Sequence, residues 1–177
     1  MTLAELIAIA REDRPVALTE GAEARIRKAR RLVKDWIAEG KTIYGITTGF
    51  GALSDVAIGA TNTRRLQHNI IMSHAAGVGD PLNHETVRSV LALRIKDLAR
   101  GHSGIRLKTV QRLIEVLNLG ICPVIPEKGS VGASGDLAPL AHLALVLIGR
   151  GEAYVKSERM PGREALRICG LKPITLE

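Results

Sequence analysis

The sequence predicts a mainly helical protein with few short strands. Apolar residues recur three and four residues apart in successive segments of the 177-residue chain, which is the spacing of amphipathic helices. Apolar residues make up 46% of the chain, and only four residues are aromatic: Trp36, Tyr44, Phe50 and Tyr154. We therefore expect a core of Leu, Ile, Val and Ala, which suits closely packed helices. The length indicates one domain, at most two.

The N-terminal part should form two helices. Thr2 and Glu5 have the spacing of a capping box, so a short helix is expected to run to about Arg11. A second helix is expected from about 20 to 39, with Gly40 as its C-terminal stop.

The middle of the chain alternates between helices and breaks. Residues 41–55 should form a short extended piece and then a glycine-rich loop, and 60–76 should be helical. The stretch "GVGDPLN" (77–83) breaks the chain before two further helices, which Gly101 and Gly120 end.

The last third contains the most apolar segment. After Pro123 and Pro126 comes a glycine-rich stretch, and then 137–148 reads as a helix that is apolar on nearly all sides and hence buried. "GEAYV" (151–155) is a candidate strand, and the tail should form a short helix and an extended end.

Charge and cysteine content exclude several functions. The net charge is +7, but the basic residues are dispersed along helices, and their densest cluster (25–34) has no aromatic interleaving or nucleic-acid motif.

No apolar run could span a membrane, and the N-terminus does not resemble a signal peptide. Cys122 and Cys169 show no pairing pattern, so we expect a soluble protein of the reducing cytoplasm. The spacing of the five histidines gives no metal site.

The stretch "KGSVGASGDLAPLAH" (128–142) is the most unusual segment, because its glycines suit neither a helix nor a strand. A phosphate-binding loop does not fit, since the anionic Asp136 follows the last glycine. A serine-nucleophile elbow does not fit either, because "GASG" is one residue too short. From the glycine content alone, an ordinary loop without chemical function remains an alternative interpretation.

A chemical interpretation accounts for the glycines. In a tight bend, the Gly135 amide nitrogen can attack the Ala133 carbonyl carbon, and a glycine is needed there because a side chain would obstruct the approach. Loss of water from the ring and from the Ser134 side chain would leave an electrophilic alkene. Asp136 could move the protons, and the buried helix behind it would hold the loop.

These residues carry a resemblance to a known family. "GSVGASGDLAPLAH" (129–142) resembles the signature of the aromatic amino acid ammonia-lyases, whose self-cyclised group is 4-methylideneimidazole-5-one (MIO). "YGITTGFG" (44–51) resembles the family's glycine-rich loop, and "LQHNIIMSHAAGVGDPL" (66–82) resembles its pocket helix. The resemblance implies that 1–177 is a single N-terminal region of the ammonia-lyase fold, with its MIO loop at 129–136, and that no external cofactor is needed.

The resemblance also implies roles for single residues. Ala133, Ser134 and Gly135 would form MIO, and Asp136 would assist its maturation. Tyr44 would be the base at the substrate β-carbon, although its phenol, which titrates near 10 when unperturbed, needs nearby cations or donors to ionise at neutral pH. The loop hinges would be Gly45, Gly49 and Gly51.

The pair Ser73-His74 bears on the substrate. It resembles the pair in the histidine ammonia-lyases, whereas members acting on phenylalanine or tyrosine have Phe-Leu or His-Leu there. A histidine beside the substrate imidazole would discriminate against a phenyl ring. Asn69, one turn earlier, could hydrogen-bond within the same pocket.

The expected reaction is therefore conversion of L-histidine to trans-urocanate and ammonia. A phenylalanine or tyrosine lyase, an aminomutase, and a non-catalytic binding or regulatory derivative remain alternatives. Family members are about three times longer, and further pocket residues and the subunit-joining helices come from their later part. We therefore expect this chain to be inactive alone, to require a C-terminal portion or partner subunit, to oligomerise, and to expose apolar faces where that partner packs.

Overall fold

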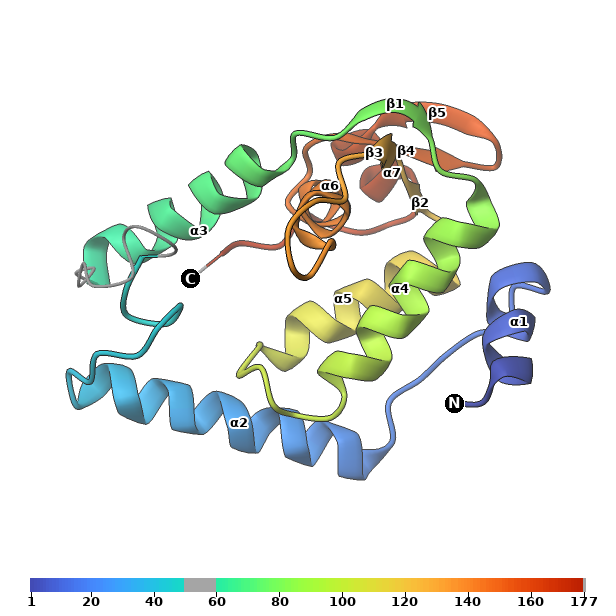
Figure 1. Ribbon diagram of the computed structural model, residues 1–177. Coiled ribbons are helices and arrows are strands. Elements are labelled where there is room, and N and C mark those ends of the chain that lie inside the picture. Colours follow the sequence, from blue (N-terminus) through green and yellow to red (C-terminus); the bar gives the residue numbers. More distant parts are fainter. Residues whose placement is uncertain (50–59, 177) are drawn as a thin grey trace.

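The computed structural model describes residues 1–49 and 60–176 and confirms a mainly helical protein with few short strands (Figure 1). The helices are α1 (Leu3–Arg11), α2 (Glu20–Ala38), α3 (Ala60–His74), α4 (His84–Leu98), α5 (Leu107–Asn118), α6 (Leu137–Leu147) and α7 (Gly162–Ile168). The strands are β1 (Val78–Pro81), β2 (Cys122–Pro123), β3 (Pro126–Lys128), β4 (Glu152–Val155) and β5 (Glu158–Pro161).

The predicted helix ends are confirmed. At the start of α1 the Thr2 hydroxyl accepts a hydrogen bond from the Glu5 amide, and the Glu5 carboxylate accepts one from the Thr2 amide. Gly40, Gly101 and Gly120 follow α2, α4 and α5 with φ angles of 65°, 78° and 68°. Only glycine adopts this left-handed conformation without strain, so these residues end the helices where the sequence predicts.

The core is aliphatic, as expected. It lies where α4 packs against α1 and α5, and where α6 and α7 cover the three-stranded sheet. Its fully buried side chains include Val87, Leu91, Val110, Leu117 and Val146. Over the described residues, no helix combines the length and apolar character needed to cross a bilayer.

The strands form two small antiparallel sheets. One contains β1 and β3, with Val78 opposite Lys128, and the other has the order β2-β4-β5. The candidate strand in "GEAYV" is confirmed as β4, whereas β1, β2, β3 and β5 were not predicted. Within the segment 41–55, for which a short extended piece and then a glycine-rich loop are expected, residues 44–47 form a turn.

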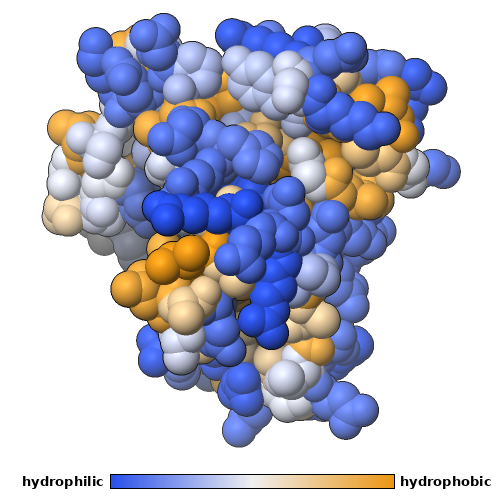
Figure 2. Space-filling model, turned by 90° about the vertical axis from the view of Figure 1, so that its right-hand side faces the viewer, coloured by the Kyte–Doolittle hydropathy of each residue, from blue (hydrophilic) through white to orange (hydrophobic). Residues whose placement is uncertain are grey.

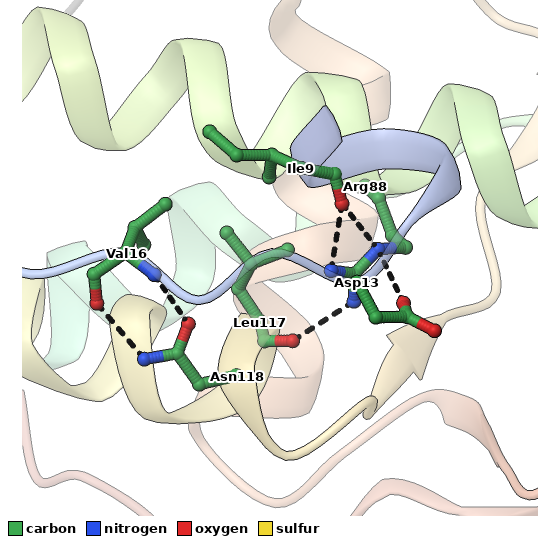
Figure 3. A network of polar contacts seen from close by, with 6 residues as sticks. All are labelled: Ile9, Asp13, Val16, Arg88, Leu117 and Asn118. Carbon is green, nitrogen blue, oxygen red and sulfur yellow. Dashed lines mark hydrogen bonds and ion pairs between the residues drawn. The ribbon is translucent and has the colours of Figure 1, made fainter. Parts of the chain in front are cut away.

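Two polar side chains attach the N-terminal arm to α4 and α5 (Figure 3). The Arg88 guanidinium is buried; its Nε and Nη2 donate to the Ile9 carbonyl at 3.0 and 2.8 Å, and its Nη1 donates to the Leu117 carbonyl at 2.9 Å. The Asn118 amide accepts from the Val16 N–H and donates to the Val16 carbonyl, both at 2.9 Å. The bonds to the Ile9 carbonyl satisfy an acceptor in the last turn of α1, and the bonds to Val16 hold the segment after α1 to α5.

Candidate active site

The segment Ala133-Ser134-Gly135 lies in a turn between β3 and the start of α6. Residues 132–134 form the turn, and its two flanking glycines, Gly132 and Gly135, have φ angles of 81° and 69°. Ala133 and Ser134 are exposed. The segment therefore lies in a turn, and the Ser134 side chain is exposed.

The backbone of Gly135 favours glycine. Its φ of 69° is a conformation that residues with a side chain rarely adopt. A Cβ atom added to it would lie 2.8 Å from the Ser130 hydroxyl oxygen, so the Ser130 side chain would have to rotate to make room.

The helix behind the turn is rigidly packed. Ala138, Ala141, Leu143 and Val146 of α6 are buried, which confirms the prediction of a buried helix. Asp136 is the N-cap residue of α6, but its side chain makes no capping hydrogen bond. Its carboxylate is therefore not committed to helix capping.

The segment that leads into the turn lies beside the segment that follows α3. The first glycine of the segment, Gly129, approaches Gly77 so closely that an added Cβ would come within 3.0 Å of the Gly77 Cα. The same two parts of the chain also meet where β1 pairs with β3 and where α3 packs on α6. The pocket-helix motif and the cyclising motif, far apart in sequence, are thus neighbours.

Ser73 and His74 form a local hydrogen-bonded pair at the end of α3. His74 Nδ1 lies 2.9 Å from the Ile70 carbonyl oxygen and 3.1 Å from the Ser73 hydroxyl. A carbonyl only accepts, so Nδ1 carries the proton in this bond and neutral His74 keeps Nε2 as an acceptor. Asn69 is exposed one turn before Ser73, on the same side of the helix.

Tyr44 begins the turn at 44–47 and is 63% exposed. Two threonines hold this segment: Thr47 Oγ1 accepts from the Ile43 amide at 2.8 Å, and the buried Thr48 accepts from the Gly45 amide at 3.2 Å. The sequence analysis did not single out these threonines, although the consecutive hydroxyls in "ITTG" are a signal for side chain-to-backbone hydrogen bonding.

Of the predicted loop hinges, Gly45 and Gly49 lie within the described residues and Gly51 does not. Gly45 has a φ of 71°, Gly49 is buried, and Gly51 lies outside the described residues. Residues 45–47 border a cavity of about 690 Å³, together with parts of α2, α4 and α5 and with Leu176. Tyr44 belongs to the segment that follows α2, away from β1 and β3, near which Gly77 and Gly129 meet (Figure 1).

A further residue of this region was missed by the sequence analysis. His142 of α6 accepts a hydrogen bond from the Gly77 amide through Nε2 at 3.0 Å. The sequence contains a sign of this bond, because His142 is the one polar side chain in an otherwise apolar helix. A partly buried polar group needs a hydrogen-bond partner. Among the described residues, no three His, Cys, Asp or Glu side chains gather as a metal site would require.

Comparison with known proteins gives the family. A family model described as aromatic amino acid lyase matches residues 1–177. The chain belongs to the aromatic amino acid lyase family. It is 53% identical, over 176 residues, to the histidine ammonia-lyase of Caldanaerobacter subterraneus subsp. tengcongensis, a match that covers 99% of this chain and 35% of that protein. The chain therefore spans about a third of the length of the curated relatives it matches.

Solved structures of a histidine ammonia-lyase and of an aminomutase contain the fold of this chain. The chain matches histidine ammonia-lyase from Trypanosoma cruzi with a TM-score of 0.89 and 39% identity, over 99% of this chain and 34% of that one. It matches the phenylalanine aminomutase of Pantoea agglomerans with a TM-score of 0.95 and 36% identity, over 100% of this chain and 34% of that one. The fold alone therefore does not distinguish a lyase from an aminomutase.

Proposed function

We propose that this chain provides the MIO-bearing N-terminal part of a histidine ammonia-lyase, which converts L-histidine to trans-urocanate and ammonia. The observation that supports the proposal most is the contact of Gly129 with Gly77, because it joins the segment that leads into the cyclising turn to the segment that follows Ser73 and His74. Identity of about 50% to proteins named histidine ammonia-lyase supports the same substrate.

Formation of the electrophile needs only this chain's own atoms. The Gly135 nitrogen bonds to the Ala133 carbonyl carbon, and its proton passes to the carbonyl oxygen. This oxygen then leaves as water with the Ser134 amide proton, which forms a C=N bond between the Ala133 carbon and the Ser134 nitrogen. The Ser134 hydroxyl leaves as a second water with its Cα proton, which Asp136 can accept. The resulting MIO group supplies an electrophilic carbon at the former Ser134 side chain.

Tyr44 is proposed as the base that removes the substrate β-proton before ammonia leaves. A phenolate requires a neighbouring cation or hydrogen-bond donors to form at neutral pH. Mobility of the loop around Gly45 and Gly49 would bring Tyr44 to the turn. His74, with Nε2 as acceptor, would take a hydrogen bond from the substrate imidazole N–H, which a phenyl ring cannot donate.

The proposed activity belongs to an assembly that includes a portion corresponding to the remaining length of the relatives. Two exposed apolar side chains flank the turn: Val131 is 80% exposed and Leu137 is 56% exposed. Leu3 and Ile7 on α1 are also exposed. Figure 2 shows apolar patches among polar residues on one side of the molecule. Chemistry at the turn needs water excluded, so these surfaces fit a covering portion or partner subunit.

An intact-mass measurement tests the electrophile. In the active assembly the chain should be lighter than its sequence by two water molecules, and Ser134→Ala should remove both this deficit and urocanate formation. Ser130→Ala is the matched control that keeps Ala133-Ser134-Gly135 intact. A full sequence mass in an assembly that forms urocanate would overturn the proposal.

A product assay separates the alternatives on this scaffold. The assembly is offered histidine, phenylalanine and tyrosine separately, and the products are identified. Urocanate from histidine, with little turnover of the other two, is the expected result. A β-amino acid product would instead identify an aminomutase.

A further inference from the structure

His142 is the one side chain of α6 that hydrogen-bonds across to the pocket-helix segment among the described contacts. Its Nε2 accepts from the Gly77 amide, three residues after His74 and within the segment that also touches Gly129. The absence of a side chain at Gly77 allows the imidazole to come this close to the backbone. An added Cβ would lie 3.0 Å from His142 Nε2 and 3.2 Å from the Pro126 Cβ.

The imidazole is in the form that this hydrogen bond requires. An acceptor Nε2 must be unprotonated, so the proton of neutral His142 is on Nδ1. Burial lowers the pKa of His142, which favours the neutral ring. The bond therefore persists at neutral pH.

The bond joins two segments that carry different parts of the proposed site. α6 begins at the cyclising turn, with Asp136 as its N-cap, and His142 lies near the middle of this helix. Gly77 follows the end of α3, where His74 is held to the Ile70 carbonyl. A shift at Gly77 would thus move the end of α3, which bears His74, relative to α6.

We propose that His142 is a positioning residue, which fixes the substrate-recognising end of α3 to the MIO-bearing helix by accepting the Gly77 amide hydrogen. This inference rests on the proposed function for its kinetic consequence, but the hydrogen bond can be tested without it. It predicts that losing the acceptor weakens substrate binding more than electrophile formation.

Three variants in the active assembly test this role. His142→Leu removes the acceptor and leaves the Gly77 N–H unsatisfied, so KM for histidine should rise about tenfold or more while kcat changes less. His142→Gln places an amide oxygen at a similar reach and should restore KM to within about threefold of the unchanged protein. His102→Leu, at an exposed histidine between α4 and α5, is the matched control and should leave KM unchanged.

Two further readouts do not depend on turnover. Hydrogen exchange of the Gly77 amide should be slow in the unchanged protein and in His142→Gln, and fast in His142→Leu. The mass deficit of two water molecules should persist in all three variants. Equal KM values for His142→Leu and the unchanged protein, or an equal loss in the Leu and Gln variants, would overturn the positioning role.

Failure of the two proposals can be distinguished. Loss of the mass deficit in the unchanged assembly, or absence of urocanate despite it, contradicts the proposed function. A normal mass deficit and normal turnover, combined with an unprotected Gly77 amide, contradict only the role of His142.

Discussion

Gly129 and Gly77 touch backbone to backbone: a Cβ added to Gly129 would lie 3.0 Å from the Gly77 Cα and 3.2 Å from the Ala138 Cβ. Neither neighbour can move aside easily, because one is backbone and the other belongs to the buried face of α6. This contact fixes where the cyclising segment leaves β3. It therefore couples the order of the turn to the position of α3.

Gly129→Ala is accordingly predicted to destabilise the fold and to impair cyclisation. Overpacking at a site without room costs on the order of 1–3 kcal/mol. Urea unfolding should show a lower midpoint, and intact mass should show a larger fraction of uncyclised chain. Gly21→Ala in α2 is the control, because its Cβ would meet only the Arg25 side chain at 3.6 Å and alanine favours a helix. An unchanged midpoint for Gly129→Ala would show that the two segments can separate.

The N-terminal arm gives a second prediction, which concerns Arg88. Arg88→Met should destabilise the protein by on the order of 3 kcal/mol, because the Ile9 carbonyl loses both Arg88 donors and the Leu117 carbonyl keeps only the Gly120 amide. The ion pair with Asp13 is not the reason. Asp13 is 73% exposed, and such a pair contributes little.

Two substitutions separate these contributions. Asp13→Asn keeps a residue that tolerates the left-handed φ of 54° and should change stability by less than about 1 kcal/mol. Arg27→Met, at an exposed arginine paired with Glu23 on α2, should cost about 0.5 kcal/mol or less. Denaturant unfolding of all three variants measures the differences. A larger loss for Asp13→Asn than for Arg88→Met would assign the stability to the ion pair instead.

Features that depend on local signals could be predicted from the sequence, whereas contacts between distant segments could not. The helices follow from apolar spacing and from stop glycines such as Gly40, which are local signals. β1 and β3 have three or four residues each and contain Gly79, Pro81 and Pro126, so no alternation of apolar and polar residues marks them. The turn at Ala133-Ser134-Gly135 was predictable because its chemistry is local. The His142–Gly77 bond spans 65 residues and depends on how α3 packs on α6, which no local pattern contains.

The buried thiol of Cys122 gives a third prediction, about reactivity. Burial raises its pKa to about 11, and the nearby Arg88 charge only partly opposes this. At pH 8 about one molecule in a thousand then carries the thiolate, which is the form that reacts. Iodoacetamide should therefore alkylate the partly exposed Cys169 first in native protein, and Cys122 only after unfolding. Between pH 7 and 10 the Cys122 rate should rise about tenfold per pH unit. Peptide mass mapping reads both sites, and rapid native labelling of Cys122 would contradict its burial.

The fourth prediction concerns His74 and the choice of substrate. His74→Leu in the active assembly should lower kcat/KM for histidine by about ten- to hundredfold, because the substrate imidazole would be buried without its acceptor. Phenylalanine, which offers no such donor, should be affected much less. Ser73→Ala is the matched control: the Nδ1 bond to the Ile70 carbonyl does not need the hydroxyl, so this variant should lose less than about threefold. Steady-state kinetics with both substrates give the comparison. Equal losses for histidine and phenylalanine in His74→Leu would mean that His74 supports the end of α3 rather than recognising the imidazole.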